Sequence, residues 1–81
     1  MDQIVHLDQR NSLYTDESMR RALMQYAKLR QDLEASHLNQ YARIDPDTGD
    51  YVIGPTRGAA RKSFRQSFGD RVAWTVHIGS A

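Results

Sequence analysis

The segment 41–53, with the sequence YARIDPDTGDYVI, constrains the fold more than any other part of this 81-residue chain. It predicts two short strands that fold back on each other around a turn at residues 45–49. Pro46 has a fixed φ that suits the first corner of a turn, and Gly49 can take the positive φ that a bulged hairpin requires. Since an isolated hairpin is only marginally stable in water, we expect the flanking segments to cover it.

A long amphipathic helix is predicted at residues 16–36, before the hairpin. Thr15 is suited to cap its N-terminus, and two acidic residues follow in the first turn, where the helix dipole favours them. The apolar stripe consists of Met19, Ala22, Leu23, Tyr26, Leu29 and Leu33. We expect this stripe to pack on the sheet, with Arg20 and Met24, which lie off the stripe, as candidates for contact with a partner.

A second helix is predicted after the hairpin, from Arg57 or Gly58 to Phe68. Thr56 is suited to cap its N-terminus, and Gly69 is suited to end it. Apolar residues recur on one face at four-residue steps, and an adjacent row is cationic. This helix is therefore expected to contribute to the core with one face and to present positive charge with another.

The last strand is predicted at residues 71–78, where large apolar residues alternate with small or polar ones. Trp74 is the expected largest anchor of the core. The fold class is therefore α+β, with a long N-terminal helix, a β-hairpin, a second helix and a final strand in one domain spanning residues 1–81. We expect a three-stranded sheet with both helices on one face. Residues 1–11 are either a loose tail or contain a fourth, edge strand at residues 3–7.

Composition narrows the functional classes. The chain has no cysteine, so it can form neither a disulfide nor a thiolate metal site. Its formal net charge of +1 argues against strong general attraction to nucleic acid. The sequence contains no apolar run near the roughly 18 residues of a membrane span and begins without a signal-peptide pattern. We expect a cytoplasmic protein that does not bind membranes.

The acidic turn is the nearest approach to a metal site. Asp45, Asp47 and Asp50 are close in sequence, but they lack the further ligands and the final Glu of a calcium loop. The three histidines have no ligand spacing, and no nucleophile elbow or phosphate loop is present. Gly54 and Gly58 flank a helix start that suits one bound anion. We therefore expect no catalytic residue, no metal and no cofactor, and hence no enzyme.

A set of cations is the most suggestive functional feature. It consists of Arg57, Arg61, Lys62, Arg65 and, further along, Arg71. These residues are interpreted either as a docking surface for an acidic protein or a phosphate backbone, or as an ordinary solvated helix face. No aromatic residue lies among them in the way that a base-stacking platform requires.

The residues of the second half resemble a known group of proteins. The matching residues are Asp47–Tyr51 in the turn, Ala59 and Ala60 in the second helix, and Trp74–Gly79 in the last strand. This pattern is similar to small bacterial antitoxin-like or toxin-associated proteins with a D-x-T-G-x-Y-type hairpin, although His77 stands where Arg is more usual. The resemblance implies a non-catalytic binding protein.

Two functional hypotheses follow. The first is a protein-binding module, antitoxin-like or an inhibitor, that occludes a toxin or a host complex through its first helix and the cations. A phage-encoded inhibitor of a host defence complex is a variant of this hypothesis. The alternative is a small nucleic-acid-binding regulator that contacts phosphates with the same cations. A homodimer through the first helix or an exposed sheet edge fits a chain of this size.

Overall fold

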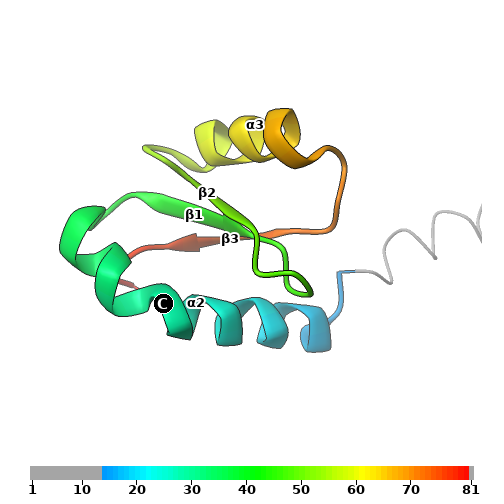
Figure 1. Ribbon diagram of the computed structural model, residues 1–81, viewed down its shortest axis with the longest axis horizontal. Helices are drawn as coiled ribbons and strands as arrows, with labels where there is room; N and C mark the ends of the chain where they lie inside the picture. Colours follow the sequence, from blue (N-terminus) through cyan, green and yellow to red (C-terminus); the bar gives the residue numbers. More distant parts are fainter. Residues whose placement is uncertain (1–13, 81) are drawn as a thin grey trace, which may run out of the picture.

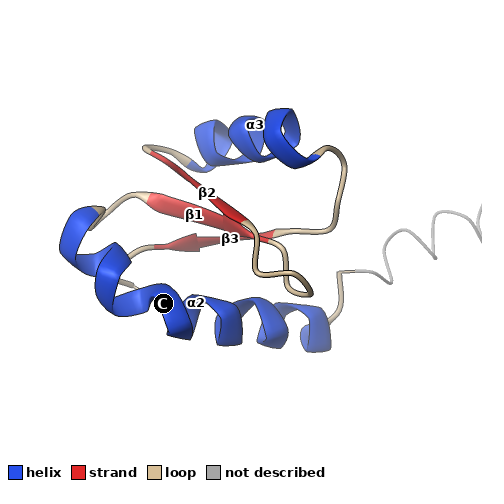
Figure 2. Cartoon of the chain, in the orientation of Figure 1, coloured by secondary structure: helices blue, strands red, loops and turns tan. Residues whose placement is uncertain are grey.

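The computed structural model describes residues 14–80. The described elements, in chain order, are α2 (Asp16–Ser36), β1 (Tyr41–Ile44), β2 (Tyr51–Gly54), α3 (Arg57–Phe68) and β3 (Trp74–His77) (Figure 2). The strands form one antiparallel sheet in the order β2-β1-β3. The predicted α+β class, the element order and the three-stranded sheet are confirmed. The predicted edge strand or tail at residues 1–11 lies outside the described residues.

Helix α2 begins where its capping signal predicts. The Thr15 side chain accepts a hydrogen bond of 3.1 Å from the backbone N–H of Ser18, which satisfies one of the free donors of the first turn. The residues that the helix buries are Ser18, Ala22, Tyr26 and Leu33. Met19 and Leu23 were expected in the buried stripe, but they are 40% and 41% exposed. The helix therefore leaves apolar surface uncovered along one side of its packed face.

The face of the sheet that contacts α2 holds the main core. Its cluster of buried residues consists of Tyr26, Leu33, Ala42, Ile44, Val76 and Ile78. Trp74 lies at the margin of this face, where its indole Nε1–H donates a 2.8 Å hydrogen bond to Ser18 Oγ. Trp74 is only partly buried, whereas Phe64 and Ile44 are the largest fully buried side chains. The prediction that Trp74 is the largest core anchor is therefore wrong.

Helix α3 lies on the opposite face of the sheet from α2 (Figure 1). Gly54 of β2 is paired with Tyr41, so it faces away from Ala42 and away from α2. A Cβ atom built on Gly54 would lie 2.5 Å from the backbone N of Ala60 in α3. The prediction that both helices share one face is therefore wrong, and the molecule has three layers.

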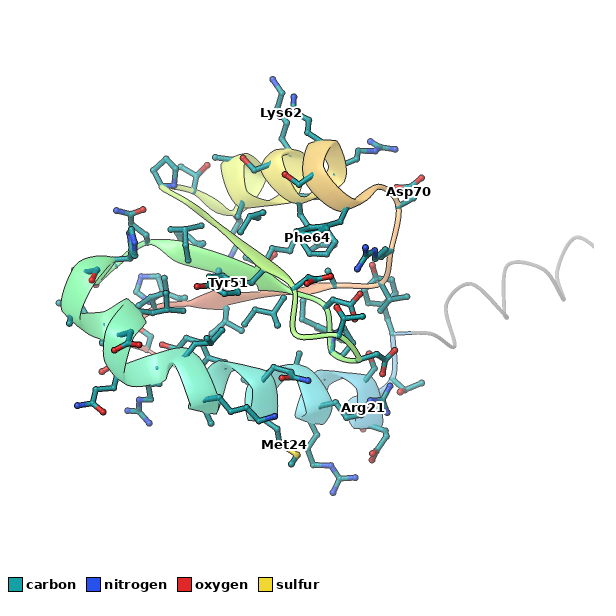
Figure 3. All side chains as sticks on the ribbon, viewed as in Figure 1. Arg21, Met24, Tyr51, Lys62, Phe64 and Asp70 are labelled. Atoms are coloured by element: carbon teal, nitrogen blue, oxygen red, sulfur yellow. The ribbon has the colours of Figure 1, made fainter. Side chains whose placement is uncertain are left out.

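The error has a physical cause. Only the face bearing Ala42 and Ile44 is continuously apolar, so the sequence pattern predicts that one face of the sheet is buried. The other face bears Arg43 and the side-chain-free surface of Gly54, which lets α3 approach the backbone closely. Phe64 points from α3 towards the sheet and is fully buried (Figure 3). The cover on this side thus consists of Phe64, the Phe68 ring packed against it and a close backbone contact, and it leaves Arg43 partly buried.

The hairpin turn is held by its own acidic side chains and by α2. Asp45 Oδ1 accepts hydrogen bonds from the backbone N–H groups of Asp47 at 2.8 Å and Thr48 at 3.1 Å. Gly49 has a φ of +80°, which a side chain would strain. Arg21 of α2 reaches across to Asp47, with 3.1 Å between Nε and Oδ1. These aspartates act as turn residues, as their types predict.

Candidate functional site

The outer edge of β3 is a feature suited to binding. Ile78 N–H donates to Gln40 O at 2.8 Å, so by the alternation of an antiparallel ladder Trp74 and Val76 also bond to β1. The backbone groups of Thr75 and His77 then point outwards. Within residues 14–80 no other strand pairs with this edge. The edge therefore offers main-chain hydrogen-bonding groups to another chain.

Some groups on this edge are already occupied. Thr75 O accepts from the Arg57 guanidinium at 3.4 Å, and His77 O accepts from the backbone N–H of Ser80 at 3.2 Å. The outward N–H groups of Thr75 and His77 have no partner in the described part of the chain. The edge thus keeps two free donors, while its acceptors are capped.

A groove of about 300 Å³ runs beside this edge. It is lined by Met19, Ala22, Leu23, Arg57, Trp74, Thr75, Val76, His77 and Ser80. The half-exposed side chains of Met19 and Leu23 give it an apolar wall from α2. We call this feature, the open edge with its groove, the β3-edge groove.

Arg57 forms the other wall of the β3-edge groove. Its guanidinium carbon lies 5.2 Å from the centroid of the Tyr41 ring, a cation–π distance. The Tyr41 ring also contacts His77 edge-to-face, with centroids 5.0 Å apart. Arg57 is therefore separated by its contacts from the other cations of α3, although the sequence places it in their row.

A larger cationic cleft, of about 870 Å³, runs along the other side of α3. Its lining residues are Tyr14, Arg43, Gly58, Arg61, Lys62, Phe64, Arg65, Gly69, Asp70, Arg71 and Val72. Five of these residues are cationic and one is acidic. Lys62 points from α3 away from the sheet, so it borders the mouth of the cleft (Figure 3). The structure thus brings together four of the five predicted cations.

Two of these cations are already paired. Arg71 bridges the hairpin, with Nη1 2.8 Å from Asp50 Oδ2 and 3.3 Å from Asp45 Oδ2. Arg65 lies 3.5 Å from Asp70 in an exposed pair, which holds it only weakly. Arg61 and Lys62 have no carboxylate within salt-bridge distance among residues 14–80. Arg71 is therefore mainly structural, whereas Arg61 and Lys62 are available to a ligand.

Arg43 is the cleft residue that sequence reasoning missed. It lies on β1, is partly buried beneath α3, and donates from Nη1 to Thr75 Oγ1 at 2.9 Å. Burial lowers the pKa of Arg43, and the nearby positive charge of Arg61 lowers it further, while Tyr14 opposes both effects. The signal in the sequence was the alternation of β1, which places Arg43 on the face of the sheet that Ala42 and Ile44 do not share. That signal becomes informative only when a helix covers the second face.

The two predicted contact residues of α2 lie outside both features. Arg20 pairs with Glu17 on the exposed surface of the helix. Met24 is 62% exposed and points away from the sheet (Figure 3). Both lie one position along the helix from the groove residues Met19 and Leu23. They therefore extend the exposed surface of α2 outwards from the β3-edge groove.

The acidic turn is internally neutralised. Burial raises the pKa of Asp45, but hydrogen bonds from the backbone of Asp47 and Thr48, together with Arg71, outweigh it and leave that pKa below its ordinary value. Within residues 14–80, no three His, Cys, Asp or Glu side chains are grouped so that they could hold a metal ion. The Asp45 carboxylate of this turn is thus occupied by backbone N–H groups of the turn and by Arg71.

Comparisons with protein-family models, with curated proteins and with solved structures find no match to this chain. No helix in the described part is both long enough and apolar enough to cross a membrane. The β3-edge groove and the cationic cleft are therefore the features from which a function is inferred.

Proposed function

We propose that this protein is a non-catalytic, antitoxin-like binding module of the cytoplasm that holds a partner protein along the β3-edge groove. The observation that supports this proposal is the open edge of β3, with the outward N–H groups of Thr75 and His77 beside an apolar wall from α2. An extended segment of the partner would add a fourth strand to the sheet. Main-chain hydrogen bonds would supply affinity, and the groove would select side chains.

The groove specifies the chemistry of the partner segment. Apolar side chains at alternate positions would pack against Met19, Leu23 and Trp74, because residues two apart in a strand share a face. An acidic side chain would pair with Arg57 on the opposite wall. The proposed partner is a toxin or a host complex whose own strand or loop is occluded when it is bound here.

The edge alone is too small for a stable complex. Specific interfaces bury roughly 800 Å² on each partner, and a four-residue strand supplies only part of that area. The exposed surface of α2 beyond the groove, with Met24 and Arg20, is the natural extension of the interface. Met24 would add an apolar contact, and Arg20 would lie at the polar rim.

The alternative function, a nucleic-acid-binding regulator, has weaker support. The predicted cations do not form one continuous stripe, because Arg57 lies in the β3-edge groove and Arg71 is paired with the hairpin aspartates. A nucleic-acid backbone calls for a row of free cations along its path. Steep, log-linear weakening of partner binding with salt would favour this alternative.

The proposal is tested by removing one outward N–H group. His77→Pro deletes a donor that faces away from β1, and proline is tolerated at such positions of an edge strand. His77→Ala is the matched control, because it removes the imidazole and keeps the N–H group. Capture from the native host, read by mass spectrometry, should recover one stoichiometric protein with the wild type and with His77→Ala, but not with His77→Pro.

Circular dichroism must show that the His77→Pro variant is folded. Recovery of the same protein by both variants in equal amounts would rule out strand addition at β3. Recovery of nucleic acid alone would rule out the protein-binding function. A homodimer through the same edge would appear instead as a dimer of the purified wild type in analytical ultracentrifugation that His77→Pro converts to monomer.

A further inference from the structure

We propose that the cationic cleft between α3 and the sheet binds a small ligand through a phosphate group. The proposal concerns the face of the sheet opposite α2 and does not depend on the β3-edge groove. It rests on Arg43 and Arg61, two cations that the fold brings close together without a carboxylate for either among residues 14–80.

Arg43 is the central observation. Its guanidinium is partly buried beneath α3, donates from Nη1 to Thr75 Oγ1 and lies close to the Tyr14 hydroxyl. A guanidinium has five N–H donors, so most of its donor capacity is unused among residues 14–80. Burying a charge beside a like charge costs free energy, which the lowered pKa of Arg43 reflects. An anion in the cleft would offset this cost by pairing with both guanidinium groups.

The surrounding residues favour a phosphate group over a single carboxylate. Arg61 and Arg65 line the cleft together with Arg43, and Lys62 borders its mouth, so more positive charge is gathered here than one carboxylate neutralises. Phosphate carries up to two negative charges and three oxygens, and guanidinium groups bind it through paired hydrogen bonds. The carboxylate that pairs with Arg65 among residues 14–80 is that of Asp70, and this pair is exposed, so Arg65 can turn towards a ligand.

The shape of the cleft favours a small, elongated molecule. The lining residues Gly58 and Gly69 lie at the two ends of α3, a 12-residue helix of about 18 Å. A Cβ built on Gly58 would meet nothing within 4 Å, so the first turn of α3 is accessible from the cleft. The positive end of the helix dipole there adds to the attraction for an anion. A phosphorylated metabolite of about nucleotide size fits this volume.

The experiment titrates inorganic phosphate and adenosine monophosphate into the full chain by isothermal calorimetry at low salt, with ¹H–¹⁵N spectra to locate binding. We expect saturable binding and shifts of the Gly58 and Gly69 amides and of Arg43 Nε–H. Arg61→Gln and Arg43→Gln should each weaken binding roughly tenfold or more, because a hydrogen bond to a charged group is lost. Arg30→Gln removes the same charge from the far face and should leave affinity unchanged.

The outcomes separate the sources of phosphate. The proposal would be overturned if Arg43→Gln and Arg30→Gln weakened binding equally. It would also be overturned if millimolar phosphate produced no chemical-shift changes at the cleft residues. Binding of a single-stranded oligonucleotide with no response to either small probe would also overturn it and assign the cleft to a polyanion. His77→Pro leaves the cleft residues intact, so loss of the protein partner in that variant and loss of phosphate binding are independent results.

Discussion

On the α2 side of the sheet, branched and aromatic side chains from both layers form the core, whereas on the α3 side the two backbones approach closely around Gly54 and Ala60. The core on the first face is an apolar cluster. The second contains one buried ring, Phe64, next to a cleft with a partly buried arginine. The face towards α2 therefore contains the apolar cluster, whereas the face towards α3 combines a close backbone contact with room for charge.

The largest expected loss of stability comes from a substitution that disrupts the close contact between Gly54 and α3. Gly54→Ala places a Cβ 2.5 Å from the backbone N of Ala60, which cannot move away as a flexible side chain could. We expect a loss of about 3 kcal/mol in the free energy of unfolding, measured by urea denaturation. Gly58→Ala is the control, because it meets nothing within 4 Å and should stabilise the helix by about 0.5 to 1 kcal/mol. An unchanged stability for Gly54→Ala would mean that α3 is not closely packed.

A smaller loss of stability is expected on the α2 side, where Trp74 is hydrogen-bonded to Ser18. Ser18→Ala removes the acceptor for Trp74 Nε1–H, which is 2.8 Å away. We expect a loss of about 1 kcal/mol, because one hydrogen bond is lost and its donor is left partly buried. Since Trp74 is the only tryptophan, its fluorescence spectrum should report the change directly. A variant with wild-type fluorescence and stability would show that this bond does not hold Trp74 to α2.

The smallest effect expected on stability at neutral pH concerns Asp45, in the hairpin turn between β1 and β2. Asp45 has a folded-state pKa below that of the unfolded chain, so it stabilises the fold above a pH of about 4 and loses this contribution as the pH falls through the folded pKa. We expect the free energy of unfolding to decline below about pH 4, and we expect Asp45→Asn to flatten that decline. Matching acid profiles for the two proteins would exclude Asp45 as the cause.

Local signals made the helices predictable from sequence. Thr15 and Thr56 each cap a helix with the hydrogen bond that their type favours, and both helices have the predicted bounds. The turn chemistry of Pro46 and Gly49 likewise located the hairpin. The last strand is shorter than predicted, Trp74–His77 instead of residues 71–78. Each successful prediction depends on residues close together in the chain.

The side on which α3 packs depended on contacts that no local pattern contains. A sheet face bearing Arg43 and a glycine does not have the apolar pattern of a buried face. Helix α3 packs closely on it because Gly54 has no side chain to keep the backbone of Ala60 away. For the same reason the sequence grouped Arg57 with Arg61 and Arg65, whereas Tyr41 and Thr75 draw it to the other side. The cations were recognisable by type, but their division between two features required the fold.

The hydrogen bond from Arg57 to Thr75 O has a consequence for the free protein. An exposed strand edge is a template on which identical chains can stack into aggregates, and a charged side chain laid across it obstructs that growth. We therefore expect Arg57 to hinder such stacking. An acidic side chain in a proposed partner segment would compete with Thr75 O for the guanidinium, whereas a copy of the same edge would bring a second arginine and no such compensation.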